Sequence, residues 1–308
     1  MRRVLFAGTP DFALPSLEAL VRHGYQVVGV LTQPDKPQTR KMIMTPPPVK
    51  VAALRYGIPV LQFDKVRKEG VQAIKDLSPD VIVTAAYGQI ISQEIIDIPP
   101  LGVINVHGSL LPAYRGSSPI QAAMINGDKV TGVTIMRTAL KVDSGDIILQ
   151  KSLPIGEKES LESLFDRLAV LGAYALIEAL DLVFAGKATY TPQDHDKATF
   201  CKMLTREDGH IDFAKTYREI NCLVRGVTPW PSAYVMLGGK RIKVWSVERE
   251  DMVLDVGRTA DSAIVKGIVV GCRDGAVRLT EVQEDGAKRM KGEDYARGHR
   301  ILEGSEVL

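Results

Sequence analysis

The sequence contains little cysteine and no long apolar run. Its three cysteines, Cys201, Cys222 and Cys272, are widely separated, which excludes a paired metal site and a disulfide framework. We expect reduced thiols, each a small buried side chain, in a cytoplasmic protein. No apolar run approaches the roughly 20 residues that cross a bilayer, and the N-terminal run is too short for a signal peptide. Neither a membrane-spanning nor a secreted protein is therefore expected.

An excess of charge of one sign is also missing. The 308 residues include 39 basic and 37 acidic side chains, and the formal net charge of +2 neither favours nor excludes a nucleic-acid partner. The five histidines, at positions 23, 107, 195, 210 and 299, have no metal-ligand spacing, so no bound metal is expected. Hydrophobic residues make up 45% of the chain, which is enough for an ordinary soluble core.

The N-terminal half alternates short apolar runs with helical patterns. The apolar runs cover residues 3–8, 26–31, 58–61, 80–86 and 102–107, and the helical patterns cover 9–22, 48–56 and 66–77. Runs that are apolar throughout are typical of strands covered by helices on both faces of a parallel sheet. The pattern predicts an α/β fold with a doubly wound, mainly parallel, Rossmann-like sheet.

The pattern changes after a long predicted helix at 160–184. Residues 187–204 have no clear period, and a short helix at 215–224 precedes β-like runs at 233–237, 241–247, 262–270 and 276–281. Glycines between these runs are typical of a small β-barrel or sandwich. The chain is therefore predicted to have an N-terminal domain over 1–189, a linker over 190–206 and a C-terminal domain over 207–308.

A glycine turn, Ala7-Gly-Thr-Pro-Asp-Phe12, follows the first predicted strand. Nucleotide-binding folds place a phosphate at such a turn, but the G-x-G-x-x-G pattern and a P-loop lysine are both missing. The Asp11 carboxylate in the first helical turn would also repel a phosphate. A tight turn before a capped helix explains the segment, and a NAD-dependent dehydrogenase is a poor interpretation.

Two polar residues stand in the otherwise apolar run at 102–107. Asn105 and His107 are two positions apart, so they share one face of the strand at its carboxyl end, where ligands bind in open α/β sheets. A single buried histidine is more simply a hydrogen-bonded core side chain, but a pair on one face favours a site. Asp143 or Asp146, in the turn after a predicted strand at 131–136, would supply a carboxylate; each is otherwise an ordinary turn residue, and spacing does not decide between them.

An amide, an imidazole and a carboxylate without a nucleophilic serine or cysteine are typical of direct acyl transfer. The amide N–H stabilises negative charge that develops on a carbonyl oxygen. The imidazole and the carboxylate move protons. The residues therefore predict an acyl-type transfer that forms no covalent enzyme intermediate.

Several motifs around these residues occur together. They are Asn105-Val-His107, Ser109-Leu-Leu-Pro112, Arg115-Gly116, Pro119-Ile-Gln121 and Asp143-Ser-Gly-Asp146. In this combination the chain closely resembles the folate-dependent formyltransferases. Further segments resemble the branch of that family that acts on methionyl-tRNA; they are 7–12, 32–35, 48–50, 86–88, 228–231, 243–245 and 297–300.

The resemblance implies a donor, an acceptor and a set of site residues. The donor would be 10-formyltetrahydrofolate, the acceptor would be the α-amino group of methionine on initiator tRNA, and no metal would take part. Asn105, His107 and Asp143 would be the catalytic trio. The folate would contact Ser109, Leu110, Leu111 and Pro112, largely through the backbone, together with Tyr87 and Gly88.

The resemblance also implies two tRNA-binding regions in a monomeric protein. Residues 33–50 would form an inserted loop that reaches the acceptor stem through Arg40 and Lys41, and an OB-like C-terminal domain would contact tRNA through Lys240, Arg241 and Lys243. Five prolines predict an extended loop without a packed core, although such a loop can also lack any role. The loop carries fewer lysines than the same loop in better-known relatives, which predicts a weaker electrostatic attraction to the tRNA. Two alternatives stay open, a formyltransferase that acts on a sugar-nucleotide amine and a non-catalytic RNA-binding protein.

Overall fold

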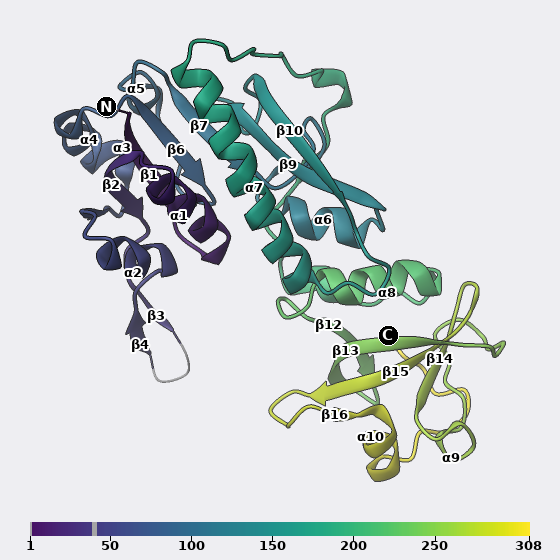
Figure 1. Ribbon diagram of the computed structural model, residues 1–308. Coiled ribbons are helices and arrows are strands. Elements are labelled where there is room, and N and C mark those ends of the chain that lie inside the picture. Colours follow the sequence, from purple (N-terminus) through teal and green to yellow (C-terminus); the bar gives the residue numbers. More distant parts are fainter. Residues whose placement is uncertain (1, 39–41) are drawn as a thin grey trace. The chain divides into compact units, whose positions relative to one another are not determined.

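The computed structural model describes residues 2–38 and 42–308. The chain divides into two compact units (Figure 1). The first consists of Met1–Pro119, Val130–Pro154 and Leu164–Cys201, and the second of Ile120–Lys129, Ile155–Ser163 and Lys202–Leu308. The division of the chain at 189 and 206 stays a prediction from the sequence.

The first unit is built on a seven-stranded sheet in the order β10-β9-β7-β6-β1-β2-β5. The strands β1, β2, β5, β6 and β7 are parallel, whereas β9 is antiparallel to β7, and β10 is antiparallel to β9. The predicted doubly wound, mainly parallel sheet is confirmed. The bounds are β1 Arg3–Gly8, β2 Gln26–Thr32, β5 Val60–Gln62, β6 Val81–Ala85, β7 Val103–His107, β9 Val130–Arg137 and β10 Ile147–Pro154.

Helices cover both faces of this sheet, which is why its parallel strands are apolar throughout. One face packs against α3, α4 and α5 through a buried cluster that includes Ile82 and Val103. The other packs against α7 so closely that a Cβ at Gly172 would lie 2.9 Å from Val106. The helices are η1 Asp11–Ala13, α1 Leu14–Arg22, α2 Pro48–Arg55, α3 Val66–Glu69, α4 Val71–Leu77, α5 Gln93–Ile96, α6 Pro119–Ile125 and α7 Leu161–Phe184, of which α6 and α7 have residues in both units.

Residues 33–50 contain a short hairpin, so the expectation of a loop without structure was wrong in part. β3 (Lys36–Gln38) pairs antiparallel with β4 (Ile43–Thr45), and the two strands extend away from the sheet below α2 in Figure 1. Met42, Ile43 and Met44 have exposed side chains there. The hairpin therefore presents an apolar surface to solvent.

Three polar side chains, which we call the clasp, tie the base of this hairpin to β5. Lys50 Nζ donates to both carboxylate oxygens of Asp35 at 2.8 Å and to Gln62 Oε1 at 2.9 Å. Gln62 Nε2 donates to Asp35 Oδ1 and to the Gln33 carbonyl, both at 2.8 Å. The Gln62 amide and then the Lys50 ammonium group hold the pKa of Asp35 below its ordinary value. The carboxylate therefore remains charged at the pH where the hairpin would function.

Residues 191–201, most of the predicted linker, pair with strands and loops of the first unit. Thr191 and Ile147 exchange two backbone hydrogen bonds at 2.8 and 2.9 Å. η2 (His195–Lys197) follows, and β11 (Phe200–Cys201) pairs parallel with β8 (Arg115–Gly116). This segment therefore lies against the loop that follows β7.

The second unit is built on a separate antiparallel sheet. Its strands run in the order β12-β13-β15-β14, and β16 pairs with β15. Alternate residues of β13, such as Ile242 and Val244, point into the core, and the residues between them are more exposed. The bounds are η3 Glu207–Gly209, α8 Tyr217–Gly226, β12 Ala233–Leu237, β13 Lys240–Glu250, α9 Ser262–Val265, β14 Ile268–Cys272, β15 Gly275–Glu284, β16 Met290–Lys291 and α10 Gly292–Gly298.

The prediction of a β-like run at 262–270 was wrong for its first half, because those residues form the helix α9. The side chain of Asp261 accepts a hydrogen bond from the Ala263 amide at 2.8 Å and caps that short helix. Lys266 then takes a left-handed conformation, with φ +50°, and ends it. Local capping here outweighs the strand preference of Ile264 and Val265.

Candidate active site

The candidate site lies at the carboxyl ends of the central parallel strands. β1 lies between β2 and β6, so the chain order reverses there, and open α/β sheets bind ligands beside such a reversal. Tyr87 and Gly88 follow β6, and Ser109–Pro112 follow β7. Both predicted folate segments therefore emerge at the same edge of the sheet.

Asn105 is held in one orientation by a threonine on the neighbouring strand. The two residues are register partners on β6 and β7, and Thr84 Oγ1 donates to Asn105 Oδ1 at 2.7 Å. Because the amide oxygen accepts from Thr84, the amide NH₂ points away from it. The half-buried side chain keeps two donors available for a ligand.

His107, which is only 5% exposed, is fixed by the loop that follows its own strand. Its Nε2 lies 3.0 Å from the backbone carbonyl oxygen of Tyr114. A carbonyl can only accept, so Nε2 carries a proton and donates it. Nδ1 is left to face Oδ2 of Asp143 at 3.7 Å, which is longer than a hydrogen bond and becomes an ion pair when the imidazole takes up a second proton.

Asp143, not Asp146, is the carboxylate that meets the imidazole. Its Oδ2 also accepts a hydrogen bond from the Gly116 amide at 2.8 Å. Asp143 has φ +47°, a left-handed conformation that costs a non-glycine residue free energy unless its surroundings hold it. The side chain of Asp143 is 16% exposed and that of His107 is 6% exposed, so the carboxylate is the more accessible of the two groups.

Side-chain hydrogen bonds from β9 and β10 hold the predicted folate segment 109–112 in place. Thr134 Oγ1 donates to the Ser109 carbonyl at 2.7 Å and accepts from the Leu111 amide at 3.1 Å. Gln150 Nε2 donates to the Leu111 carbonyl and to Thr134 Oγ1, both at 2.9 Å. Ser109 is fully buried, whereas Leu110 and Pro112 are half-buried. These contacts fix the backbone of the segment at the edge of the sheet.

Tyr87 and Gly88 differ in what they can offer. The Tyr87 ring is buried in the apolar cluster beneath the sheet, where desolvation raises its pKa to about 12. Its hydroxyl has no hydrogen-bond partner among the described residues. Gly88 is exposed with φ +82°. Any ligand contact here would come from the backbone around Gly88.

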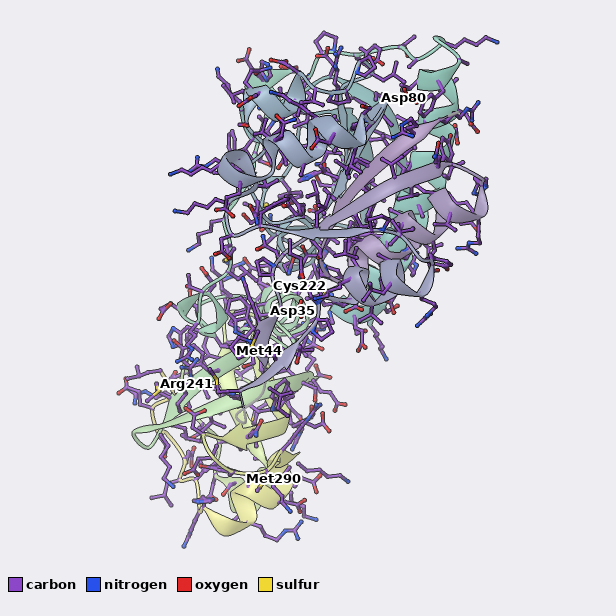
Figure 2. The ribbon with its side chains drawn as sticks, turned by 90° about the vertical axis from the view of Figure 1, so that its left-hand side faces the viewer. Asp35, Met44, Asp80, Cys222, Arg241 and Met290 are labelled. Carbon is purple, nitrogen blue, oxygen red and sulfur yellow. The ribbon has the colours of Figure 1, made fainter. Side chains whose placement is uncertain are left out.

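The residues predicted to contact tRNA have three different settings. Arg40 and Lys41 lie outside the described residues. Lys240 pairs with Glu284 at 2.9 Å, and the Arg241 guanidinium stacks 3.8 Å from the centre of the Tyr234 ring. Arg241 is labelled in Figure 2. Lys243 shares its outward face of β13 with Arg241, because Ile242 between them is buried.

Sequence reasoning missed the residues that orient the trio. Thr84 and Thr134 lie within apolar strands, where threonine is common and carries no signal of its own. The Tyr114 carbonyl is a backbone group and has no sequence signature. Among residues 2–38 and 42–308, no cluster of histidine, cysteine or acidic side chains is suited to a metal ion. The same residues form no helix that is long and apolar enough to cross a membrane.

The chain belongs to the formyl transferase family. Residues 1–180 match the formyl transferase domain and residues 203–300 match the formyl transferase C-terminal domain. Methionyl-tRNA formyltransferase of Ruminiclostridium cellulolyticum is 44% identical over 313 residues, which cover 99% of this chain and 99% of that protein. The enzyme of the same name from Bacillus subtilis is 44% identical and covers 100% of this chain and 98% of its own length.

Solved structures with lower identity share the fold. The N-formyltransferase from Helicobacter canadensis, in complex with folinic acid and dTDP-3-aminofucose, has a TM-score of 0.68 at 17% identity and covers 94% of this chain and 100% of its own. HypX from Aquifex aeolicus, in complex with tetrahydrofolic acid, has a TM-score of 0.65 at 17% identity. The match covers 96% of this chain and 47% of HypX, so this chain spans about half of that protein.

Proposed function

We propose that this protein transfers the formyl group of 10-formyltetrahydrofolate to the α-amino group of methionyl initiator tRNA. The product would be N-formylmethionyl-tRNA for translation initiation. The observation that carries the proposal is the full-length identity of 44–46% to methionyl-tRNA formyltransferases, together with a trio held in one geometry. Two sugar N-formyltransferases of solved structure are 17% and 21% identical to this chain.

Asn105 stabilises the formyl group while the amine attacks it. Its free amide N–H groups stabilise the negative charge that develops on the formyl oxygen when the amine attacks. Thr84 fixes the direction of these donors before the substrate arrives. Preorganised donors stabilise the tetrahedral state without reorganising during the reaction.

Asp143 and His107 handle the proton. The attacking nitrogen forms a bond to the formyl carbon and loses one proton, and the bond from that carbon to the folate nitrogen breaks. Asp143, the more accessible group, takes the proton directly or through one water. His107 Nδ1 faces the same carboxylate, so the pair shares the proton and returns it to the leaving nitrogen.

The residues present fit a folate donor. A pterin ring needs a rigid surface at a fixed position, and two segments follow β6 and β7 at one sheet edge, with the 109–112 segment fixed by Thr134 and Gln150. The donor already carries an activated formyl group, so no energy-supplying nucleotide is required. This agrees with the absence of a phosphate-binding glycine pattern in the sequence.

For the acceptor, the proposal assigns two surfaces to tRNA. One is the segment 33–50, whose sequence includes Arg40 and Lys41 and whose Met42, Ile43 and Met44 side chains are exposed. The other is β13, with Lys240 at its start and Arg241 and Lys243 on its outer face. The Arg241 guanidinium stacks on Tyr234 and its Nε is buried, so its terminal nitrogens are the atoms that would contact a phosphate.

We also propose a cytoplasmic monomer. In its favour, all three cysteines are free thiols, two of them buried, as expected in a reducing compartment. Sedimentation of the purified protein at micromolar concentration should give the mass of one 33.7 kDa chain. A stable dimer would contradict this part of the proposal.

Labelled 10-formyltetrahydrofolate tests the proposed reaction. The intact protein is incubated with this donor and either methionyl initiator tRNA or an amino-sugar nucleotide. We expect label in the aminoacyl-tRNA only. Transfer to the sugar nucleotide would favour the sugar-modifying alternative, and tRNA binding without any transfer would favour a non-catalytic RNA-binding protein.

A further inference from the structure

A buried polar chain lies behind Asp143, made from residues that the mechanism above does not use. Arg115 and Gln193 are 5% and 6% exposed. Arg115 Nε and Nη2 donate to Gln193 Oε1 at 3.0 and 2.7 Å. Gln193 Nε2 in turn donates to the backbone carbonyls of Asp143 at 2.9 Å and Gly145 at 2.7 Å. These hydrogen bonds therefore link a guanidinium, through one amide, to the turn that bears the catalytic carboxylate.

The orientation of the Gln193 amide is forced from both ends. A guanidinium can only donate, so the atom that faces Arg115 is the oxygen. A backbone carbonyl can only accept, so the atom that faces Asp143 and Gly145 is the nitrogen, and both of its protons are used. No other amino-acid side chain of this length offers an acceptor at one edge and two donors at the other. A glutamate at 193 would have the same shape and no donor.

The turn that Gln193 contacts is the strained part of the site. Asp143 adopts φ +47°, and Gly145 approaches the Arg137 carbonyl so closely that a Cβ would overlap it. A non-glycine residue keeps a left-handed conformation only where its surroundings determine it. Two hydrogen bonds from one buried amide to carbonyls on both sides of Ser144 provide this constraint.

Arg115, at the other end of this series of hydrogen bonds, is also held by its neighbours. Arg115 Nη2 lies 2.9 Å from His195 Nδ1, which must accept because the guanidinium donates. His195 belongs to η2, and the flanking Thr191 and Thr199 bond to Ile147 and Arg115 through the backbone. Burying a guanidinium costs free energy unless its donors are satisfied, so Arg115 and Gln193 stabilise each other.

We propose that Gln193 is a positioning residue that holds Asp143 in its left-handed conformation, and that Arg115 holds Gln193. The inference rests on the proposed role of Asp143 in formyl transfer. Gln193 does not touch the reacting atoms. It acts by keeping the Asp143 carboxylate within reach of His107 and the attacking amine.

Two substitutions separate this role from a purely structural one. Gln193→Glu keeps an acceptor for Arg115 but removes both donors to the turn, whereas Gln193→Met removes both functions. We expect Gln193→Glu to lower kcat up to about 10²-fold, the size of effect that a misplacement of about 1 Å can produce. KM for both substrates should stay near that of the unchanged protein, and the melting temperature should fall because the Asp143 and Gly145 carbonyls lose their donor. Gln193→Met should lower kcat similarly and lower the melting temperature further, because it also leaves a buried guanidinium without its acceptor.

Asp194→Asn is the matched control. Its side chain is exposed, caps η2 and pairs with Lys197, so it perturbs the same segment without touching the turn. We expect its kcat to be unchanged. A Gln193→Glu enzyme with kcat near that of the unchanged protein would overturn the inference, because Gln193 would then serve only to satisfy Arg115.

A double-mutant cycle with Asp143→Asn distinguishes failure of this inference from failure of the proposed function. If Gln193 acts through Asp143, adding Gln193→Glu to Asp143→Asn causes little further loss of kcat. Independent, multiplicative losses would overturn the inference and leave the proposed function standing. Full activity of Asp143→Asn alone would overturn the proposed role of Asp143, and with it the basis of the inference.

Discussion

Two loop regions of the first unit differ in how they hold their polar groups. The loops around Ser109–Gly116 and Asp143–Asp146 are fixed by the buried side chains of Thr134 and Gln193 and by the amide of Gln150. The hairpin within 33–50 is tied at its base by the clasp, and its apolar side is exposed. Figure 2 labels Asp35 at that base and Met44 on β4.

The difference matches what each region would have to do. A catalytic group must stay within a fraction of an ångström of its working position, so each orienting hydrogen bond contributes to the rate. A segment that reaches a large partner needs exposure and reach, so its anchor contributes mainly to binding. Substitutions in the first region should therefore change kcat, and substitutions in the second should change KM for tRNA.

The largest effect should come from Asn105→Ala, which removes the proposed oxyanion donor. We expect kcat to fall about 10²- to 10³-fold, because that is the usual loss when one such donor is removed. Steady-state formyl transfer to methionyl-tRNA measures it, and folate binding checks that the site is still formed. Activity close to that of the unchanged enzyme would remove Asn105 from the mechanism.

Thr84→Val should have a smaller effect on the same step. It deletes only the donor that orients Asn105, and one net hydrogen bond is worth about 0.5–1.5 kcal/mol. We expect kcat to fall about two- to thirteenfold, with KM for the donor little changed.

Thr138→Val is the matched control for this variant. The buried Thr138 hydroxyl has no hydrogen-bond partner among the described residues, so its removal should leave kcat unchanged. Equal losses in the two variants would show that Thr84 does not act through Asn105.

Lys50→Met should show whether the hairpin contributes to tRNA binding and not to the chemical step. It removes three hydrogen bonds of the clasp while keeping a long apolar stem in place. We expect KM for tRNA to rise several-fold with kcat nearly constant. Lys68→Met, at an exposed position on α3, is the control for loss of one positive charge. A fall in kcat without a change in KM would abolish the contrast between the two regions.

The smallest effect is a change in titration. The Gln62 amide contributes most to the lowered pKa of Asp35, and Lys50 contributes next. A lowered pKa in the folded state means that the clasp is intact above the ordinary aspartate range and loosens only as the pH falls through the lower value. NMR titration of the Asp35 carboxyl carbon should show its pKa rising in both Gln62→Leu and Lys50→Met. An unchanged titration in Gln62→Leu would show that the clasp does not form in solution.

The sequence predicts the sheet and part of the trio because both depend on local pattern. Strands apolar on both faces read as a parallel sheet, and Asn105 and His107 share a face because side chains alternate along a strand. Spacing did not separate Asp143 from Asp146, since that choice depends on a turn held by Gln193, 50 residues further along the chain. The edge strand β10 and the hairpin strands were missed because they are short or half-exposed, with little apolar pattern.

The antiparallel contact between Thr191 and Ile147 has a practical consequence for anyone excising the catalytic half. A fragment that stops at residue 189 would retain every member of the trio and lose the amide that braces one of them. Ending instead after Cys201, where β11 completes its pairing with β8, keeps that brace with the groups it supports. The functional limit of this domain therefore lies a dozen residues beyond the place where sequence periodicity fades.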